Sequence, residues 1–296
     1  MNHTRALALA SAAGAVISAT LLLSGCSSSG VPAASPNSKS PMFEHIHELV
    51  PDPSDGTLLV ATHEGLYRLT IGDNGSATAV GPISGLDFDP MGFTIAGATA
   101  YASGHPGPTT PNTFGNPNLG LITSTDLGKT WTNVSLTGQT DFHGLTVEVG
   151  AGGKAHVFGY DASKGRLERS LDGGKTWSDG AELMARDILA LGDQLYATTP
   201  DGLAVSGDNG TTFTVDATAP KLYVLAADPS GTIAGVDTTG TLWTRAPGQK
   251  WVRGHSVTGT PQALATEGTR IYVADDRGIA ITDDDGATWT VLEVHK

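Results

Sequence analysis

A degenerate eight-residue motif, Ser-x-Asp-x-Gly-x-Thr-Trp, recurs along this chain and constrains its fold more than any other feature. Four copies are centred on Asp126, Asp172, Asp208 and Asp284. A fifth copy, at 244–251, keeps the glycine and the tryptophan but has lost the aspartate. The Asp carboxylate can accept backbone N–H bonds, and the glycine can adopt the positive φ of a reversal. Each copy therefore predicts a tight hairpin turn that leads into a strand.

The spacing of the copies predicts the architecture. The aromatic residues that close the five copies are separated by 46, 36, 38 and 38 residues. Repeats of that length with four short strands each are typical of propeller blades. Six units fit between residues 42 and 296, and their inner strands are expected to begin near His45, Asp89, Asp141, Arg186, Lys221 and Thr260. We predict an all-β protein, a single β-propeller of six four-stranded blades, with seven blades as the alternative count.

Residues 1–25 have the pattern of an export signal. Arg5 precedes an apolar run that ends at Leu23, and small residues lead to Cys26, the only cysteine in the chain. This pattern is typical of a cleaved signal peptide rather than a membrane-spanning helix. The sequence before Cys26 resembles the lipobox of bacterial lipoproteins. The resemblance implies cleavage before Cys26, lipidation of Cys26, and anchoring to the outer leaflet of the bacterial cytoplasmic membrane or to the cell surface.

Residues 26–41 are rich in serine and proline and have no hydrophobic period, so they are expected to form a flexible tether to a propeller domain at 42–296. Without the signal peptide the chain has 16 basic and 30 acidic residues, a net charge of −14. That charge argues against nucleic acid as a partner.

Propeller geometry places five of the nine histidines on one face. The starts of the inner strands share that face, and the mouth of the central channel, with the loops that join second to third strands; the motif turns lie on the opposite face. The candidate ligand residues there are His45, His47, His63, His105, His143 and Met91, beside the carboxylates of Asp89 and Asp141.

These donors are of the types that bind transition metals, because imidazole suits zinc and copper alike, and a thioether such as that of Met91 favours copper. We therefore expect a small ligand or a copper or zinc ion at the channel mouth. The competing interpretation is that each histidine satisfies backbone groups at its own strand start.

The recurrent motif is the Asp box. With residues 45–47, 61–65, 103–107 and 141–144, it makes nearly the whole mature chain resemble the bacterial Asp-box (BNR-repeat) lipoproteins labelled sialidase-like or glycosyl hydrolase. The resemblance implies a propeller fold and a glycan ligand or substrate. Since the Phe/Tyr-Arg-Ile-Pro motif of sialidases is missing, the sialidase catalytic roles are not transferred to this chain.

A glycoside hydrolase would need two carboxyl groups at a suitable separation. The candidate catalytic residues are Asp89, Asp141, Asp187, Glu64 and Tyr223, and the candidates for an arginine clamp are Arg166, Arg186, Arg253 and Arg277. A third alternative is a non-enzymatic scaffold for docking or assembly. Only 6% of the residues are aromatic, which weighs against a large docking surface rich in aromatic anchors.

Overall fold

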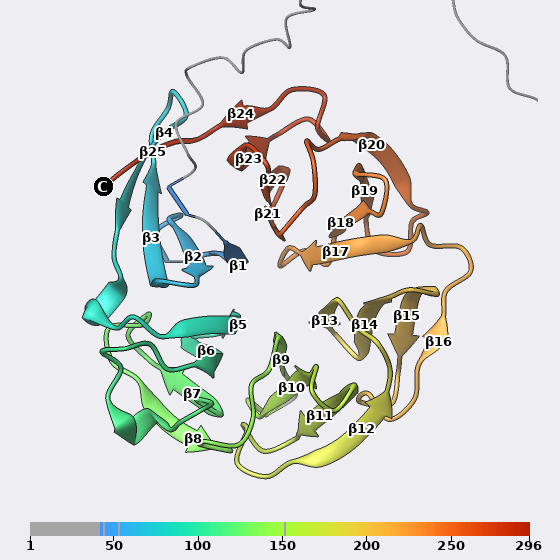
Figure 1. Ribbon diagram of the computed structural model, residues 1–296. Helices are drawn as coiled ribbons and strands as arrows, with labels where there is room; N and C mark the ends of the chain where they lie inside the picture. The colour runs from blue at the N-terminus through green and yellow to red at the C-terminus, as the bar shows by residue number, and fades with distance from the viewer. Residues whose placement is uncertain (1–41, 44, 53, 151) are drawn as a thin grey trace, which may run out of the picture. The chain divides into compact units, whose positions relative to one another are not determined.

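The computed structural model describes residues 42–43, 45–52, 54–150 and 152–296 (Figure 1). The signal peptide, Cys26 and the tether predicted for 1–41 lie outside the described residues. Within the described part of the chain, no helix is both long enough and apolar enough to cross a membrane.

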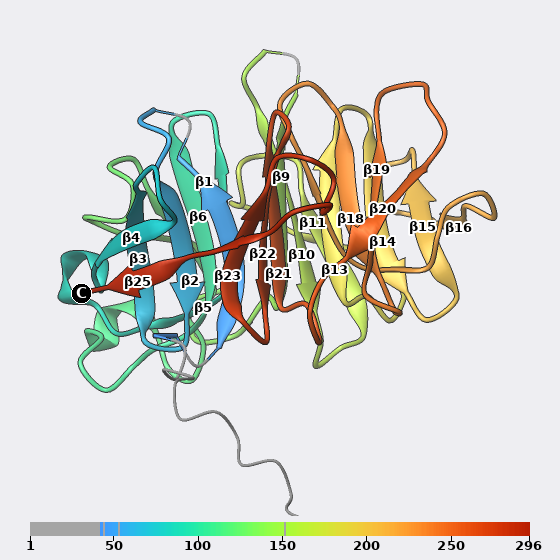
Figure 2. The same cartoon turned by 90° about the horizontal axis from the view of Figure 1, so that it is seen from above.

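The described residues form a six-bladed β-propeller, as predicted, with the six sheets arranged in a ring around a central channel (Figures 1 and 2). Blade 1 holds β1 (Ile46–Pro51), β2 (Leu58–Thr62), β3 (Gly65–Ile71) and β4 (Ser76–Val80). Blade 2 holds β5 (Asp89–Ala96), β6 (Thr99–His105), β7 (Leu121–Ser124) and β8 (Thr132–Ser135). Blade 3 holds β9 (Gly144–Val149), β10 (Ala155–Asp161), β11 (Arg166–Ser170) and β12 (Ser178–Glu182).

Blade 4 holds β13 (Asp187–Leu191), β14 (Gln194–Thr199), β15 (Gly202–Ser206) and β16 (Thr214–Val215). Blade 5 holds β17 (Leu222–Ala227), β18 (Ile233–Asp237), β19 (Thr241–Arg245) and β20 (Val252–Ser256). Blade 6 holds β21 (Ala263–Glu267), β22 (Arg270–Asp275), β23 (Gly278–Thr282) and β24 (Thr290–Val291). Two short 3-10 helices, η1 (Ile83–Gly85) and η2 (Asn112–Phe114), lie in the connections before β5 and before β7.

The C-terminal strand closes the ring. β25 (Glu293–His295) pairs in parallel with β4 as a fifth, outermost strand of blade 1, with Val294 opposite Ala77 (Figure 1). Just before it, Leu292 is buried in the hydrophobic cluster that blade 1 shares with blade 6. The last residues of the propeller are thus tied to its first sheet.

The core lies between neighbouring blades rather than inside any one of them. All five residues of β2, with the sequence LLVAT, are buried. A continuous apolar run suits a strand that has a sheet on both faces. Between blades 1 and 2, Leu66 packs in one cluster with Phe93 and the box residue Trp131. The Trp131 ring packs edge to face against Phe88, with the ring centres 5.5 Å apart. The aromatic residue of an Asp box therefore helps to pack two neighbouring sheets together.

The Asp boxes join third to fourth strands, as predicted. In the box between β7 and β8, Thr130 N donates to Asp126 Oδ1 at 2.8 Å, and Gly128 N donates to Ser124 Oγ at 2.8 Å. Both Leu127 (φ 57°) and Gly128 (φ 87°) are left-handed. The other three boxes repeat this pair of positive φ values. The box sequence predicts a positive φ for the glycine alone, but the residue before it also adopts one.

Inner strands β1 and β5 carry register shifts near their first residues, between Ile46 and Glu48 and between Asp89 and Gly92. Such bulges break the two-residue alternation and re-aim side chains. Both bulges lie at the face where the inner strands start, which we call the histidine face; the opposite face is the Asp-box face.

Candidate functional site

Two short segments place their polar side chains on the histidine face by the same device. In each, a buried apolar residue stands between two polar ones, so that the polar pair points away from the core. Ile46 is buried, and its N–H donates to Gln262 Oε1 at 2.9 Å, which leaves His45 and His47 on either side. Phe142 is fully buried against the Trp177 ring at 4.9 Å, and its N–H donates to Ser103 Oγ at 3.0 Å. Asp141 and His143 flank it in the same way.

The first histidine cluster consists of His45, His47 and His63, each of which offers a ring nitrogen within 4.8 Å of the others. His63 enters from the turn between β2 and β3, where Thr62 Oγ1 donates to the carbonyl of Gly65 at 3.0 Å. His47 Nε2 lies 3.3 Å from His63 Nδ1.

Asp89, the first residue of β5, faces this cluster from blade 2. Its Oδ2 lies 2.8 Å from His63 Nδ1, and its Oδ1 lies 2.9 Å from His47 Nε2. The latter pair is close but not aligned as a hydrogen bond, and Oδ1 is buried without a hydrogen-bond partner in the described structure. The side chains of His47 and Asp89 are only 6% and 18% exposed. Two imidazole nitrogens and two carboxylate oxygens therefore lie close together, although one of the oxygens accepts no hydrogen bond from a described residue.

The electrostatics of the first histidine cluster favour neutral imidazole at His45. Burial, then the neighbouring His47 and His63, and then Arg186 lower the pKa of His45. Desolvation raises the pKa of Asp89, but the close contacts with His47 and His63 outweigh it and lower the pKa of that carboxyl below its ordinary value. A metal ion binds an imidazole in its neutral form and a carboxyl in its ionised form, which are the forms favoured at His45 and Asp89.

The second histidine cluster consists of His105, Asp141 and His143, which again offer ligand atoms within 4.8 Å of one another. Asp141 Oδ2 lies 3.0 Å from His105 Nε2 and 2.7 Å from His143 Nε2. Asp141 Oδ1 is buried, and no described residue forms a hydrogen bond with it. The hydrogen bond to Asp141 raises the pKa of His143, so this cluster stabilises a protonated imidazole more than the first cluster does.

The other half of the channel mouth has different chemistry. Arg186 Nη2 donates to the carbonyl of Gln262 at 3.1 Å, and its guanidinium stands 5.1 Å from the centre of the Tyr223 ring. Since Arg186 belongs to blade 4 and Gln262 to the segment before β21, the arginine spans the mouth toward blade 6. Tyr223, one of the candidate catalytic residues, is thus covered by a cation.

The remaining candidates from the sequence lie in separate surroundings. Asp187 Oδ1 and Oδ2 accept the N–H groups of Ile188 and Leu225, at 2.8 and 2.9 Å, so this carboxylate ties blade 4 to blade 5. Glu64 N donates to Thr62 Oγ1 at 3.2 Å, and the Glu64 carboxylate lies 3.4 Å from the same hydroxyl oxygen. Met91 is half-buried in the bulged part of β5.

The arginines proposed for a clamp are engaged in separate contacts. Arg166 pairs with Asp179 and Glu182, Arg253 donates to Thr241, and Arg277 pairs with Asp275. Of the four arginine candidates, Arg186 is the one whose charge acts on a histidine of the first cluster.

Two features of the mouth are not predicted by the sequence pattern. The side chain of Gln262 fixes the strand start at Ile46, and Glu48 lies inside the ring, where burial and then Asp187 raise its pKa well above the ordinary range. The position of Glu48 directly after the His-x-His segment is the sequence signal from which its place inside the ring could have been predicted.

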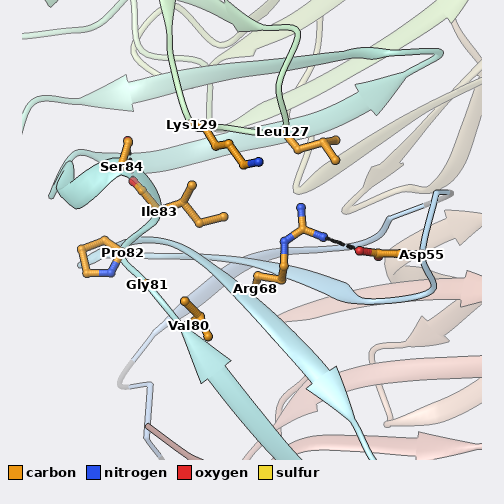
Figure 3. Close-up of a pocket in the computed structure, with 9 residues that line it drawn as sticks. All are labelled: Asp55, Arg68, Val80, Gly81, Pro82, Ile83, Ser84, Leu127 and Lys129. Carbon is orange, nitrogen blue, oxygen red and sulfur yellow. Dashed lines mark hydrogen bonds and ion pairs between the residues drawn. The ribbon is translucent and has the colours of Figure 1, made fainter.

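A hollow of about 650 Å³ lies away from the histidines, between Arg68 of blade 1 and the Asp-box residues Leu127 and Lys129 of blade 2 (Figure 3). Its arginine is already paired, because Arg68 Nη1 lies 2.7 Å from Asp52 Oδ2 and 3.1 Å from Asp55 Oδ2. None of the residues that line this hollow is a histidine or one of the candidate ligand residues.

No protein-family model and no curated protein matches this chain. Solved structures do match. A structure of a nidogen/laminin complex is 16% identical, with a TM-score of 0.59, over 79% of this chain and 93% of that chain. An auxiliary nutrient-binding protein from Bacteroides thetaiotaomicron is 11% identical, with a TM-score of 0.54, over 84% of this chain and 70% of that chain.

A GH74 xyloglucanase from Xanthomonas campestris is 16% identical, with a TM-score of 0.54, over 84% of this chain but only 45% of the enzyme. The chain thus spans less than half of that enzyme. At these identities the comparisons establish the β-propeller fold, which is shared by proteins of unrelated function. Function must be argued from the histidine face itself.

Proposed function

We propose that this protein binds a transition-metal ion, zinc or copper, at the first histidine cluster together with Asp89. The main support for this proposal is the spacing of four possible ligand atoms. His47 Nε2 lies 3.3 Å from His63 Nδ1, and the two Asp89 oxygens lie 2.9 and 2.8 Å from these two nitrogens. Ligands on a tetrahedral ion with bonds of about 2.1 Å stand about 3.4 Å apart, close to that spacing. An ion among these atoms would also satisfy Asp89 Oδ1, which is buried and has no hydrogen-bond partner among the residues that the structure describes.

The donor set restricts the metal class. Three imidazoles and one carboxylate suit zinc, copper, nickel or iron rather than calcium or magnesium, which prefer oxygen ligands. Asp89 could bind the ion directly or orient the imidazoles, as carboxylates beside ligand histidines commonly do. A small ligand bound through the metal would lie at the channel mouth.

Metal titration of the mature, tag-free protein after chelator treatment tests this proposal. We expect wild type to bind one equivalent of zinc or copper that His47→Ala binds roughly a hundredfold more weakly. His255→Ala, which removes an exposed histidine of β20 outside both clusters, should leave binding unchanged. Absence of uptake by wild type, or equal uptake by His47→Ala, would refute the proposal.

We also propose that the propeller is tethered outside the cell by lipid on Cys26, on the strength of the lipobox resemblance. Replacement by Cys26→Ser should abolish labelling with radioactive palmitate and move the protein from the membrane fraction to the soluble fraction. Unchanged labelling would contradict this assignment.

The hydrolase alternative has no comparable support in the site. Asp187 is occupied by two backbone N–H groups, while Asp89 and Asp141 each contact two imidazoles. We therefore do not assign a glycosidase mechanism.

A further inference from the structure

The second histidine cluster lies where blades 2 and 3 meet, and the backbone fixes its three side chains. His105 is the last residue of β6, and Asp141 and His143 stand just before β9 (Figure 1). His105 is paired across the sheet with Asp89. His143 N donates to the carbonyl of Tyr160 in β10 at 3.1 Å. The cluster is therefore attached to the ends of strands and is preorganised for binding.

The hydrogen-bond contact on the far side of the His105 ring defines the state of its other nitrogen. His105 Nδ1 lies 3.4 Å from the carbonyl oxygen of Pro117. A carbonyl can only accept, so this contact places the ring proton on Nδ1 and leaves Nε2 of a neutral ring without one. A histidine that binds a metal commonly donates its other ring N–H to a carbonyl in this way.

The unprotonated nitrogen lies beside an oxygen that also lacks a proton. His105 Nε2 is 3.0 Å from Asp141 Oδ2, and the same oxygen is 2.7 Å from His143 Nε2. Ligands at right angles on an ion with bonds of about 2.1 Å stand about 3.0 Å apart, close to both distances. A cation among these atoms would replace the repulsion between His105 and the carboxylate by two favourable contacts.

The second histidine cluster is more open than the first. The side chains of His105 and His143 are 44% and 43% exposed, whereas that of His47 is 6% exposed. Three protein ligands leave at least one position of a four-coordinate ion free for water or another ligand. With two neutral imidazoles and one carboxylate, a divalent ion also keeps one uncompensated positive charge, which favours an anion at that position.

We propose that the second histidine cluster binds a second divalent transition-metal ion through His105, Asp141 and His143, with an open coordination position that takes water or a small anion. Two imidazoles and a carboxylate suit zinc, cobalt or iron rather than calcium or magnesium. The site shares no ligand with the first histidine cluster and does not rest on the metal proposed there. It should bind more weakly, because it has three protein ligands and the ion must displace the proton that Asp141 stabilises on His143.

Titration with cobalt(II), followed by visible absorption, tests this site in the mature, tag-free protein after chelator treatment. The titration is run at about pH 8, above the ordinary histidine pKa of about 6.5. The double variant His47→Ala/His63→Ala removes two imidazoles of the first histidine cluster. We expect it to bind one equivalent of cobalt, and addition of His143→Ala to weaken that binding roughly a hundredfold. Addition of His255→Ala instead, at an exposed histidine of β20, should change nothing.

Two further measurements separate a metal site from an ordinary hydrogen-bonded network. Sodium azide should shift the absorption of cobalt bound to the double variant, because azide enters the open position. Asp141→Asn keeps the shape of the side chain but removes its charge, and should weaken cobalt binding as His143→Ala does. Melting temperatures report that each variant is folded.

The outcomes for the two clusters are distinguishable. If the first cluster alone binds no metal, wild type and the double variant bind the same single equivalent, and His143→Ala removes it. The present proposal is overturned if the folded double variant takes up no cobalt, if His143→Ala leaves its affinity unchanged, or if azide leaves the spectrum unchanged. Should the double variant not fold, His143→Ala in the wild-type background must lose the weaker equivalent and keep the tighter one.

Discussion

At the scale of single residues, the geometry of the histidine face depends on backbone positions as much as on imidazoles. Gly104 precedes His105 and has φ of +146°. A Cβ at this position would lie 1.9 Å from the backbone oxygen of Asp89. Asp89 and His105 are cross-strand partners in blade 2, so Gly104 allows β5 and β6 to approach where the two clusters adjoin.

Gly104→Ala should therefore cost about 2–4 kcal/mol of unfolding free energy, because the methyl group must displace the backbone of β5 in a conformation unsuited to alanine. Metal affinity should fall as well, since Asp89 moves with that backbone. Denaturant unfolding and zinc titration measure the two effects. Gly97→Ala is the matched control: Gly97 also has a positive φ, but no atom of the described residues would contact the added Cβ within 4 Å. Equal losses in both variants would contradict the role of close approach.

At the scale of elements, the Asp-box turns stabilise the fold by electrostatic interactions as well as by their backbone geometry. Hydrogen bonds from Thr130 and Ser124 lower the pKa of Asp126 to about 2, and the equivalent bonds lower that of Asp208 to about 2 and hold that of Asp172 well below its ordinary value. An aspartate in an unfolded chain has a pKa of about 3.9. A carboxyl with a lowered folded-state pKa stabilises the fold above the unfolded value, and this stabilisation is lost as pH falls through the folded value.

The melting temperature should accordingly drop between about pH 4 and pH 2, and Asp172→Asn should reduce that drop. At neutral pH, Asp172→Asn should lower the melting temperature by about 3–6 °C through lost hydrogen bonds to the turn. Asp201→Asn, in an exposed turn without an Asp box, should have no such effect. Melting temperatures of the three proteins measured across pH 2–7 test this prediction. An identical fall of the melting temperature with pH in Asp172→Asn and wild type would rule out the electrostatic contribution of Asp172.

The repeat of Asp boxes predicted the elements well because each box fixes a turn by local hydrogen bonds and leaves the strands on either side in register. Local sequence was less informative at the strand starts. The bulge between Ile46 and Glu48 arises from tertiary contacts, among them the bond from Ile46 N to Gln262, 216 residues away. The two-residue period alone could place the histidines on one face but could not divide them into two clusters.

At the scale of the whole molecule, the ring is closed by the pairing of β25 with β4. Six blades could be counted from the spacing of the boxes, but the fifth strand of blade 1 has no repeat signal of its own. Its pairing is parallel and three residues long, and it joins residues more than 200 positions apart. Such a contact depends on the completed ring and not on any local pattern.

Deleting residues 293–296 should lower the melting temperature by about 5 °C, because it exposes the edge of β4 and removes Val294 from the cluster shared by blades 1 and 6. Glu293→Ala keeps the strand and should behave as wild type. A deletion variant that melts at the wild-type temperature would show that β25 does not contribute to closure.

We propose that three imidazoles and Asp89 hold a transition-metal ion at the channel mouth, and the zinc X-ray absorption spectrum of the loaded protein tests this coordination directly. The spectrum is recorded on the His143→Ala variant with one equivalent of zinc, so that zinc bound at the second histidine cluster does not contribute to it. We predict about four nitrogen and oxygen ligands at about 2.0–2.1 Å, with the multiple scattering of three imidazoles, and loss of that signal when His47→Ala is added. A shell of oxygen ligands alone, or a spectrum that His47→Ala leaves unchanged, would contradict the account.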